Sequence, residues 1–398
     1  MQWLIPNPFV ADTETRRRAW NLSISAHMWV SYKITHTPQH VFDLVNPALA
    51  DLVGSRPALV VVDKAILELY GATLVPYVTR RIRCEALIAV EGSESQKSWE
   101  QVDRVCGEAV RCGLRRDGVM VGVGGGAVLD VVGLAASLYR RGTRFIRIPT
   151  TLVGLVDVSV GIKQGINFRS KKNALGTFFP PYGCINDVTF LRTLPVRLLA
   201  CGVAEILKMA IVRDGKLFDL LLDNALELLR THFECPADCA EEILVRAESA
   251  MLDELQPNLF EHNLQRLVDF GHTFSPTLEA ASGYQLPHGE AVALDMLLST
   301  SVAVERGLCQ QDDLARILVA YLRVGLPIAH PLIEPGLLTS AMQDARAHRG
   351  GDLNLVLPTR IGEATFVQDV KLETIVAALN RIACLSERTR SKNGCDSR

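Results

Sequence analysis

The sequence has no strong excess of charge of either sign, no long apolar run and no pair of cysteines spaced as CxxC. Its formal net charge is −2 over 398 residues, so nothing indicates binding to nucleic acid or to an anionic membrane surface. The longest apolar runs are well short of the roughly 20 residues that a membrane-spanning helix needs. Cys235 and Cys239 lie closest together among ten scattered cysteines, and no second pair completes a cysteine zinc site.

A signal peptide, an internal repeat and a low-complexity segment are likewise not recognisable. We therefore expect a cytoplasmic protein with reduced thiols. Hydrophobic residues make up 48% of the chain and charged residues 22%, which is the composition of an ordinary globular protein, and the length suggests two domains.

Strand-like and helix-like segments alternate in the first half of the chain. Segments 58–63, 85–91 and 118–126 are short apolar runs typical of buried parallel strands, and helical periodicity separates them. After about residue 195 almost every periodic segment is helical, apart from a strand expected within 353–362. The sequence therefore predicts an α/β domain over residues 1–195, a mainly α-helical domain over residues 196–390 and a disordered polar tail over residues 391–398.

A glycine-rich segment, GVGGGAVLD at residues 122–130, follows a predicted strand and opens a predicted helix. Gly122, Gly124 and Ala127 fit the spacing GxGxxG/A, and amides at the start of a helix favour the pyrophosphate of a dinucleotide. A plain tight turn would also explain these glycines. The order is unusual, because the acidic residue Asp63 ends a strand before the glycines instead of following them by about 20 residues. Asp63 alone could also be a turn residue.

Two histidines, His272 and His288, and an acidic residue, Glu205, form a candidate metal site. Neutral imidazoles and a carboxylate suit a zinc ion that keeps one position open for substrate. Either histidine alone could instead be a hydrogen-bonded core residue. Further ionisable residues lie nearby in the sequence: Lys208, Arg266 and Asp269. Because a structural helix gains little from ionisable groups beside apolar runs, this gathering favours an active site.

A polar strip follows the strand predicted at 143–151. Asp157 and Lys163 interrupt an otherwise apolar segment, and Lys171, Lys172 and Asn173 come next. Lysines near a glycine loop can neutralise a phosphate. A solvated basic turn would explain residues 169–173 equally well, but it would leave Asp157 and Lys163 unexplained.

In combination these motifs resemble the sugar phosphate cyclases, the superfamily of 3-dehydroquinate synthase. The similarity covers about residues 55–365 and rests on GGGAVLD, RRGTRFIRIPTTL, DVSVGIK, KKNALGTFFPP, AEILK, DFGHTF and LPHGEAVA. The resemblance implies an N-terminal α/β domain that binds the dinucleotide NAD, and a mainly α-helical C-terminal domain that binds a metal. It also implies a homodimer and a small-molecule sugar phosphate as substrate.

The resemblance further implies roles for individual residues. The zinc ligands would be Glu205, His272 and His288, and some members of the superfamily work with cobalt. The NAD contacts would be Asp63, Glu94, Lys97, Gly125, Gly126, Asp130, Thr150, Thr151, Asp157, Lys172, Phe190 and Thr193. The substrate and catalytic residues would be Asp157, Lys163, Asn173, Lys208 and Arg266. Arg141 would be lent to the phosphate in the neighbouring subunit.

Departures from the superfamily pattern concern the substrate. Where 3-dehydroquinate synthases resemble NLGHTFGHA, this chain has DFGHTFSPT, so that Asp269 replaces an asparagine and the second histidine is lost. The segment 245–258 lacks a substrate-facing lysine, and His348 and Arg349 replace a lysine pair. Unpaired like charges in a partly desolvated site cost several kcal/mol, so a carboxylate substrate is disfavoured. A neutral polyol, whose hydroxyl can donate to Asp269, is favoured.

The motifs DVSVGIK, DFGHTFSP, ELQPN and HRGGDLNLVLPT resemble the branch that cyclises sedoheptulose 7-phosphate. Within it, Asp269 with His348 resembles the 2-epi-5-epi-valiolone synthases, which make a C7-cyclitol. This implies transient NAD-dependent oxidation, β-elimination of phosphate, re-reduction and an intramolecular aldol step.

Several alternatives stay open at this point. A 2-epi-valiolone synthase or a desmethyl-4-deoxygadusol synthase would use the same substrate, and 3-dehydroquinate synthase shares the chemistry. From a different class, a metal-dependent polyol dehydrogenase related to glycerol dehydrogenase would accumulate NADH. The complete set of candidate ligands argues against a catalytically inactive binding protein.

Overall fold

A computed structural model describes residues 29–169, 171–348, 351 and 353–393. Residues 1–28 of the predicted α/β domain, and residues 394–398 of the predicted tail, lie outside this range. In the part of the chain that is described, no helix is both long enough and apolar enough to cross a membrane.

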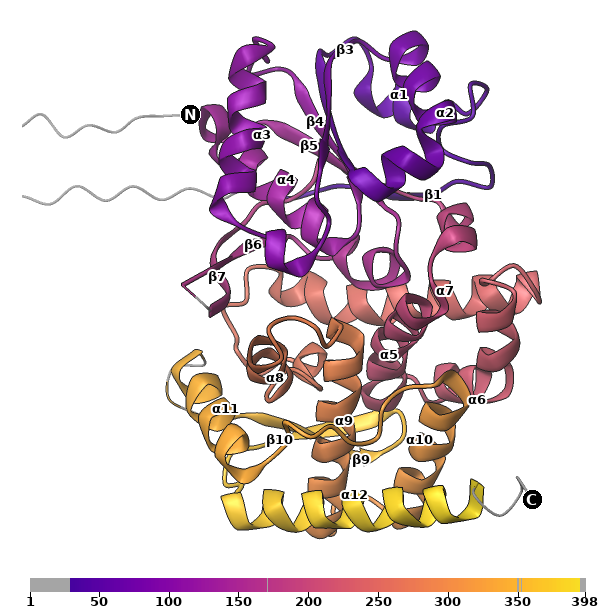
Figure 1. The fold of residues 1–398 in the computed structure, drawn as a ribbon, viewed down its shortest axis with the longest axis vertical. Helices are drawn as coiled ribbons and strands as arrows, with labels where there is room; N and C mark the ends of the chain where they lie inside the picture. The colour runs from indigo at the N-terminus through magenta and orange to yellow at the C-terminus, as the bar shows by residue number, and fades with distance from the viewer. Residues whose placement is uncertain (1–28, 170, 349–350, 352, 394–398) are drawn as a thin grey trace, which may run out of the picture. The chain divides into compact units, whose positions relative to one another are not determined.

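The first half of the chain forms a six-stranded sheet in the order β1-β8-β5-β4-β2-β3, in which every neighbouring pair is parallel (Figure 1). The strands are β1 (Ile34–His36), β2 (Ala58–Asp63), β3 (Cys84–Val90), β4 (Val119–Gly124), β5 (Arg144–Pro149) and β8 (Gly183–Asn186). The helices among them are α1 (Ala48–Val53), α2 (Lys64–Arg81), α3 (Trp99–Arg111) and α4 (Gly126–Leu138).

Helices cover both faces of this sheet because successive strand residues point to opposite sides. In β2, Val60 and Val62 pack with residues of α1 and α2, whereas Leu59 and Val61 pack with residues of α3 and α4. All four side chains are fully buried. The near-continuous valine run of β2 is therefore the pattern of a strand that is buried on both faces, as predicted.

The parallel arrangement brings the carboxyl ends of the strands to one edge of the sheet. Short helical segments follow several of them at this edge: η1 (Glu94–Gln96), η3 (Gly154–Val158) and η4 (Val188–Thr193). In open α/β sheets, ligands bind outside this edge. One further short segment, η2 (Tyr139–Arg141), instead follows α4.

An antiparallel hairpin of β6 (Lys163–Phe168) and β7 (Lys171–Phe178) interrupts the alternation, which the sequence did not predict. The start of this hairpin is held by Arg147 of β5, whose side chain is fully buried and donates to the carbonyl of Lys163. Arg147 donates to the carbonyls of Val158 and Gly161. The polar strip thus forms the π-helical turn η3 and this hairpin, and Arg147 ties both to the sheet.

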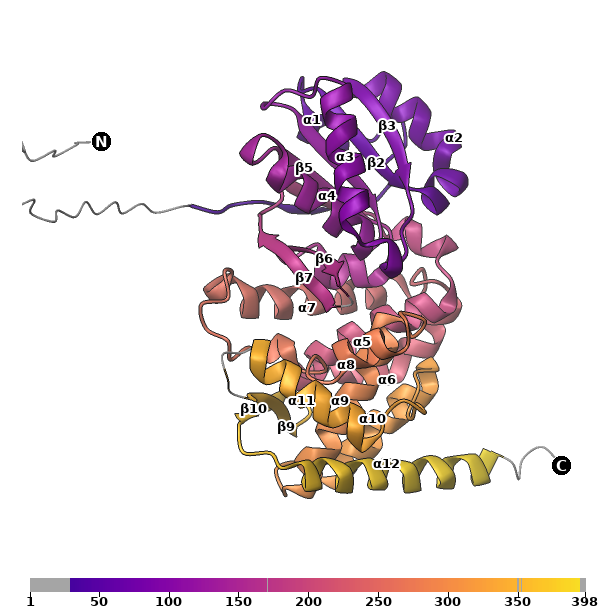
Figure 2. The same cartoon turned by 60° about the vertical axis from the view of Figure 1, so that its left-hand side comes forward.

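The second half is mainly helical, as predicted (Figure 2). Its helices are α5 (Val196–Val212), α6 (Gly215–Arg230), α7 (Ala237–Leu255), α8 (Ser275–Ala281), α9 (His288–Glu305), α10 (Gln311–Val324), α11 (Pro335–His348) and α12 (Leu372–Asn393). Two short segments, η5 (Gln256–Asn258) and η6 (Leu267–Asp269), lie between α7 and α8. The strand expected near residue 355 is β9 (Leu355–Arg360), which pairs with β10 (Glu363–Val367).

One large apolar core joins α5, α6, α7, α9, α10, α11 and α12 with β9. The sheet ends at Asn186 and α5 begins at Val196; the division into domains 1–195 and 196–390 stays a prediction. Helix α12 extends to Asn393, three residues into the tail that we expected to be disordered. Arginine and lysine are good helix formers, so they can extend a helix whose earlier turns are packed.

Candidate active site

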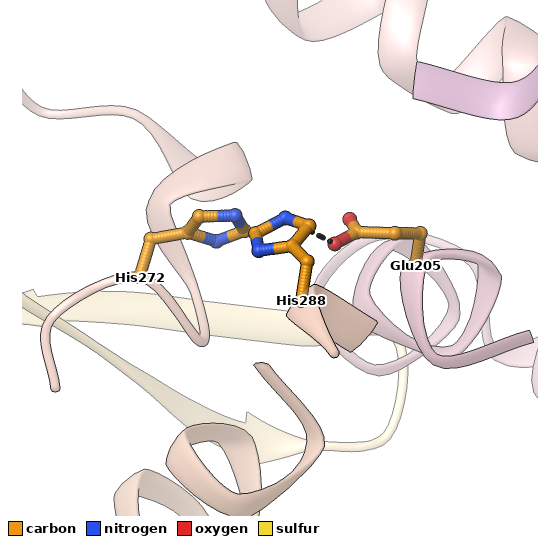
Figure 3. Close-up of side chains that lie close together, drawn as sticks. All are labelled: Glu205, His272 and His288. Carbon is orange, nitrogen blue, oxygen red and sulfur yellow. Dashed lines mark ion pairs between the residues drawn. The ribbon is translucent and has the colours of Figure 1, made fainter. Parts of the chain in front are cut away.

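Glu205, His272 and His288 meet at one point although they are far apart in the sequence (Figure 3). One ligand atom from each residue lies within 4.8 Å of the other two. The Nε2 atom of His288 is 3.2 Å from Oε1 of Glu205. The two imidazole rings face each other edge-on, with their centroids 5.3 Å apart. The geometry therefore agrees with the metal cluster predicted from the sequence.

Close packing of α5 against α9 brings Glu205 and His288 together. Gly289 makes this approach possible, because a Cβ atom there would lie 2.4 Å from the backbone oxygen of Cys201 on α5. His272 is placed by the turn before α8. Asp295 of α9 holds that turn, since its Oδ2 atom accepts from the amides of Thr273, Phe274 and Ser275.

The electrostatic surroundings act differently on the three residues. Burial alone would raise the pKa of Glu205, but the Lys208 ammonium and both histidines outweigh it and hold that pKa well below the ordinary value. Burial, together with the Lys208 charge, lowers the pKa of His272 to about 3, so this ring is neutral and can bind a metal. Burial also opposes the charge on His288, but Glu279 and Glu205 raise its pKa to about 9.

The three residues fit a divalent metal. Both carboxylate oxygens of Glu205 are buried, with Lys208 Nζ 2.7 Å from Oε2 and His288 Nε2 3.2 Å from Oε1. A buried carboxylate needs compensating positive charge, and a bound cation would add to it. Two imidazoles and one carboxylate are a donor set used by zinc sites that leave a position open for substrate.

The glycine loop and Asp63 lie side by side at the carboxyl edge of the sheet. A Cβ atom on Gly124 would be 3.2 Å from that of Asp63, and one on Gly92 would be 1.9 Å from an Asp63 oxygen. Gly125 precedes α4 and supplies no side-chain cap, so first-turn amides of α4 are available to an anion. The unusual order in the sequence is explained, because β2 and β4 are neighbours in the sheet.

A charged network lies between this edge and the hairpin. Lys97 is almost fully buried, and its Nζ is 2.5 Å from Asp130 Oδ2 and 2.6 Å from Asn173 Oδ1. Burial lowers the pKa of Lys97, but Asp130 and Glu94 outweigh it and the net shift is upward. Asn167 donates to Glu94 and accepts from the Asn173 amide. Three of the expected cofactor residues and one expected substrate residue are thus linked in one network through Lys97 and Asn167.

Two of the cations expected to bind substrate, Lys163 and Arg266, share one acidic partner. Lys163 Nζ is 2.5 Å from Glu261 Oε1, and Arg266 pairs with both Glu261 and Asp269. The charge of Asp269 also contributes to raising the pKa of buried Lys208. Asp269 is thus paired with Arg266, and its carbonyl accepts from the amide of the ligand residue His272 at 3.0 Å.

Other expected residues lie in different surroundings. Thr150 and Thr151 follow β5, and Asp157 lies on η3. Phe190 and Thr193 lie on η4, where Thr193 contacts the Tyr70 hydroxyl at 2.8 Å. Lys172, an expected NAD contact, pairs with Glu279 beside His288.

Arg141 is not brought to the cluster within the described part of the chain, since it is exposed on η2. His348 ends α11, and its side chain is outside the structural description, so its role stays a prediction. Thr150, Thr151, Asp157 and the remaining cofactor contacts also stay predictions.

Sequence reasoning missed three acidic residues: Glu261, Glu279 and Asp295. Glu261 pairs with Lys163 and Glu279 pairs with Lys172, both of which the sequence had indicated. Asp295 holds the turn that carries His272. Asp295 interrupts the apolar run ALDMLL, and Glu279 lies seven residues after His272. An acidic residue inside an apolar helix is a signal that could have identified both.

Comparison with known proteins agrees with this geometry. Residues 87–201 match the family model of the 3-dehydroquinate synthase N-terminal part, and residues 202–347 match that of the C-terminal part. The chain is 44% identical over 382 residues to a 2-epi-5-epi-valiolone synthase of Streptomyces hygroscopicus subsp. jinggangensis, which covers 94% of this chain and 91% of that protein. It is 37% identical over 349 residues to the demethyl-4-deoxygadusol synthase of Trichormus variabilis. That match covers 85% of this chain and 84% of that protein.

A solved structure is also similar. It is that of ValA, a 2-epi-5-epi-valiolone synthase from Streptomyces hygroscopicus subsp. jinggangensis 5008, with NAD+ and Zn2+ bound. Its TM-score is 0.87 at 43% identity, over 91% of this chain and 99% of that chain. The chain therefore belongs to the 3-dehydroquinate synthase family of sugar phosphate cyclases.

Proposed function

We propose that this protein is a sugar phosphate cyclase that converts sedoheptulose 7-phosphate into 2-epi-5-epi-valiolone and phosphate. The observation that carries the proposal is the meeting of Glu205, His272 and His288 beside Asp269, in a chain of this family. Relatives that bear this name are 41–44% identical to the chain over most of its length, which supports the choice of product.

NAD and zinc, or cobalt in its place, are the proposed cofactors. Glu205, His272 and His288 would hold the metal, which supplies a Lewis acid that lowers the pKa of a substrate hydroxyl. The glycine loop, with Asp63, would hold NAD+, which supplies a hydride acceptor and returns the hydride later, so that no net oxidation results. The related ValA structure, with NAD+ and Zn2+ bound, supports this assignment.

The phosphate end of the substrate would be held by Lys163, Asn173 and Arg141. Lys163 pairs with Glu261 in the structure, so the phosphate dianion of the substrate would compete with the Glu261 carboxylate for the Lys163 ammonium. Charge-assisted hydrogen bonds to the phosphate favour its departure by β-elimination, because they stabilise the charge that develops on the leaving group.

The hydroxyl end of the substrate would be oriented by Asp269, Lys208 and Arg266. Lys208 remains protonated, because the charges of Glu205 and Asp157 overcome the effect of burial and raise its pKa. It can therefore only donate, while Asp269 accepts from a hydroxyl. Arg266 is already paired with Asp269 and Glu261, so a substrate carboxylate at this position would compete with two carboxylates for one cation, which argues against the substrate of 3-dehydroquinate synthase.

Two further parts of the proposal come from the sequence alone: a cytoplasmic location and a homodimer. Arg141 is exposed in the single chain, which is compatible with a role in the site of a second copy.

The deciding experiment incubates the purified protein with sedoheptulose 7-phosphate, NAD+ and Zn2+, and measures phosphate release, NADH absorbance and the cyclitol formed. We expect phosphate release, a single product identified as 2-epi-5-epi-valiolone by NMR, and no accumulation of NADH. The substrate of 3-dehydroquinate synthase, supplied in parallel, should give no phosphate. Stoichiometric NADH would indicate a polyol dehydrogenase instead, and a different cyclitol would overturn the assigned product.

A further inference from the structure

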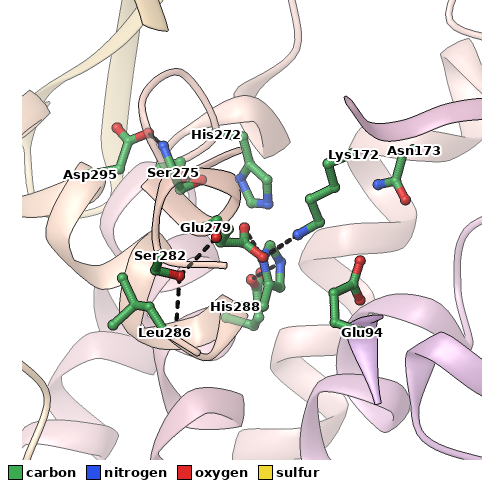
Figure 4. Close-up of polar contacts among 12 residues, drawn as sticks. Glu94, Lys172, Asn173, His272, Ser275, Glu279, Ser282, Leu286, His288 and Asp295 are labelled. Carbon is green, nitrogen blue, oxygen red and sulfur yellow. Dashed lines mark hydrogen bonds and ion pairs between the residues drawn. The ribbon is translucent and has the colours of Figure 1, made fainter. Parts of the chain in front are cut away.

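Glu279 is a buried carboxylate that no expected role explains. It lies on α8 and is only 2% exposed. Its Oε1 atom is 2.9 Å from Nδ1 of His288, and its Oε2 atom pairs with Lys172 (Figure 4). A buried carboxylate is tolerated only where it is paired and hydrogen-bonded, and both partners of Glu279 belong to the candidate active site.

The contacts of Glu279 determine which nitrogen of His288 can bind a cation. Lys172 Nζ is 3.3 Å from Nδ1, farther than the 2.9 Å of Glu279 Oε1, and the ammonium has Oε2 of Glu279 as its own partner. Because an ionised carboxylate can only accept, Nδ1 carries the hydrogen. The lone pair of a neutral ring is then on Nε2, which is the atom that faces Glu205.

Lys172 connects this arrangement to the cofactor side. It lies on β7 of the hairpin, whose next residue, Asn173, accepts from Lys97 at 2.6 Å. Glu279 therefore contacts the first residue of α9 and a strand of the hairpin at once. One carboxylate thus joins the metal cluster to the network of Lys97 and Asp130.

We propose that Glu279 is a positioning residue that fixes the tautomer and the orientation of His288, with Lys172 holding the carboxylate in place. The inference rests on the proposed function, because it requires that a metal binds at Glu205, His272 and His288. Partners of metal-binding histidines commonly contribute 10- to 100-fold to metal affinity (order of magnitude).

The test measures the dissociation constant for zinc by competition with a chelator, in the full-length protein after removal of metal. We expect Glu279→Gln to raise this constant about 10- to 100-fold, since the amide is uncharged and directs its NH2 group at either Lys172 or His288. Glu279→Asp keeps the charge and should recover part of the affinity. The cobalt-loaded protein should show a changed visible spectrum in Glu279→Gln, because the orientation of His288 is altered.

A matched control is Glu254→Gln. Glu254 is also a largely buried carboxylate in an ion pair between helices, and its partner is Arg213. We expect its zinc affinity and cobalt spectrum to equal those of the wild type. Thermal unfolding of each metal-free variant reports on folding separately from metal binding.

The outcomes separate this inference from the proposed function. If the wild type binds zinc and Glu279→Gln binds it equally well with an unchanged cobalt spectrum, the positioning role is wrong and the proposed function stands. If saturating zinc restores kcat in Glu279→Gln, the role in metal binding is supported. If the wild type itself binds no zinc, both are overturned.

Discussion

His272 and His288 differ in charge although they belong to one cluster. Burial and the nearby Lys208 ammonium lower the pKa of His272 to about 3, while two carboxylates raise that of His288 to about 9. The same residue type thus takes opposite protonation states because of its immediate neighbours. The surroundings of each residue decide its chemistry here, and we propose that the choice of substrate depends on Asp269.

We predict that Asp269→Asn lowers kcat/KM for sedoheptulose 7-phosphate by about 10- to 100-fold. The reason is that a hydrogen bond from a substrate hydroxyl to a charged group contributes about 1.5–3 kcal/mol. Steady-state phosphate release measures the effect. Asp253→Asn, which alters an exposed ion pair with Arg213, serves as control. Unchanged kcat/KM in Asp269→Asn would remove our physical argument for the substrate.

At the scale of elements, the contact between α5 and α9 sets the spacing of the metal ligands. We predict that Gly289→Ala destabilises the protein by about 1–3 kcal/mol, because an added methyl group would overlap the backbone of Cys201. It should also weaken zinc binding, since His288 moves away from Glu205. Urea unfolding and zinc titration measure the two effects.

Gly107→Ala in α3 is the control for that substitution. A Cβ atom at Gly107 would meet no neighbouring atom within 4 Å, so alanine should be neutral, or stabilising by about 0.5–1 kcal/mol, through its higher helix propensity. Equal stability of Gly289→Ala and the wild type would contradict the packing argument.

The start of η4 is held by the buried carboxylate of Asp187. Burial alone would raise its pKa, but hydrogen bonds from His40, Thr189 and the Val41 amide outweigh it and lower the pKa below 3.8. Because the folded pKa is lower than the unfolded one, this carboxylate stabilises the fold above about pH 4. That stability is lost as the pH falls through the folded pKa.

We predict that Asp187→Asn lowers the unfolding free energy at pH 7 by about 1–3 kcal/mol, and that the difference from the wild type shrinks below pH 4. Urea unfolding at pH 7 and near pH 3 tests this. Asp117→Asn removes an exposed pairing with Arg115 and should change stability by less than about 0.5 kcal/mol. A difference from the wild type that is the same at both pH values would mean that the charge of Asp187 is not responsible.

Across the whole molecule, metal binding and folding are linked because the three ligands come from separate segments. Glu205 lies on α5, His272 lies in the turn that precedes α8, and His288 lies on α9. We predict that zinc at 100 times its dissociation constant stabilises the protein by about 2.7 kcal/mol. Calorimetry before and after chelation measures the change in Tm. His272→Ala with His288→Ala should abolish the shift, and an equal shift in that double variant would place the zinc elsewhere.

The amino-acid sequence by itself determined the two-part fold, through valine-rich strands in the first half and helical periodicity in the second. It also identified Glu205, His272 and His288, because motifs preserve the residue types that the chemistry needs. Only the tertiary structure decided how these groups act on one another. The pairing of Lys172 with Glu279 and the support from Asp295 were not predictable, since each joins segments far apart in the chain. The β6–β7 hairpin joins neighbouring segments, but no residue of β7 is buried, so its sequence carries no apolar alternation that would predict a strand. Periodicity reports which face of an element is buried, but the partner of a buried charge depends on which elements pack together.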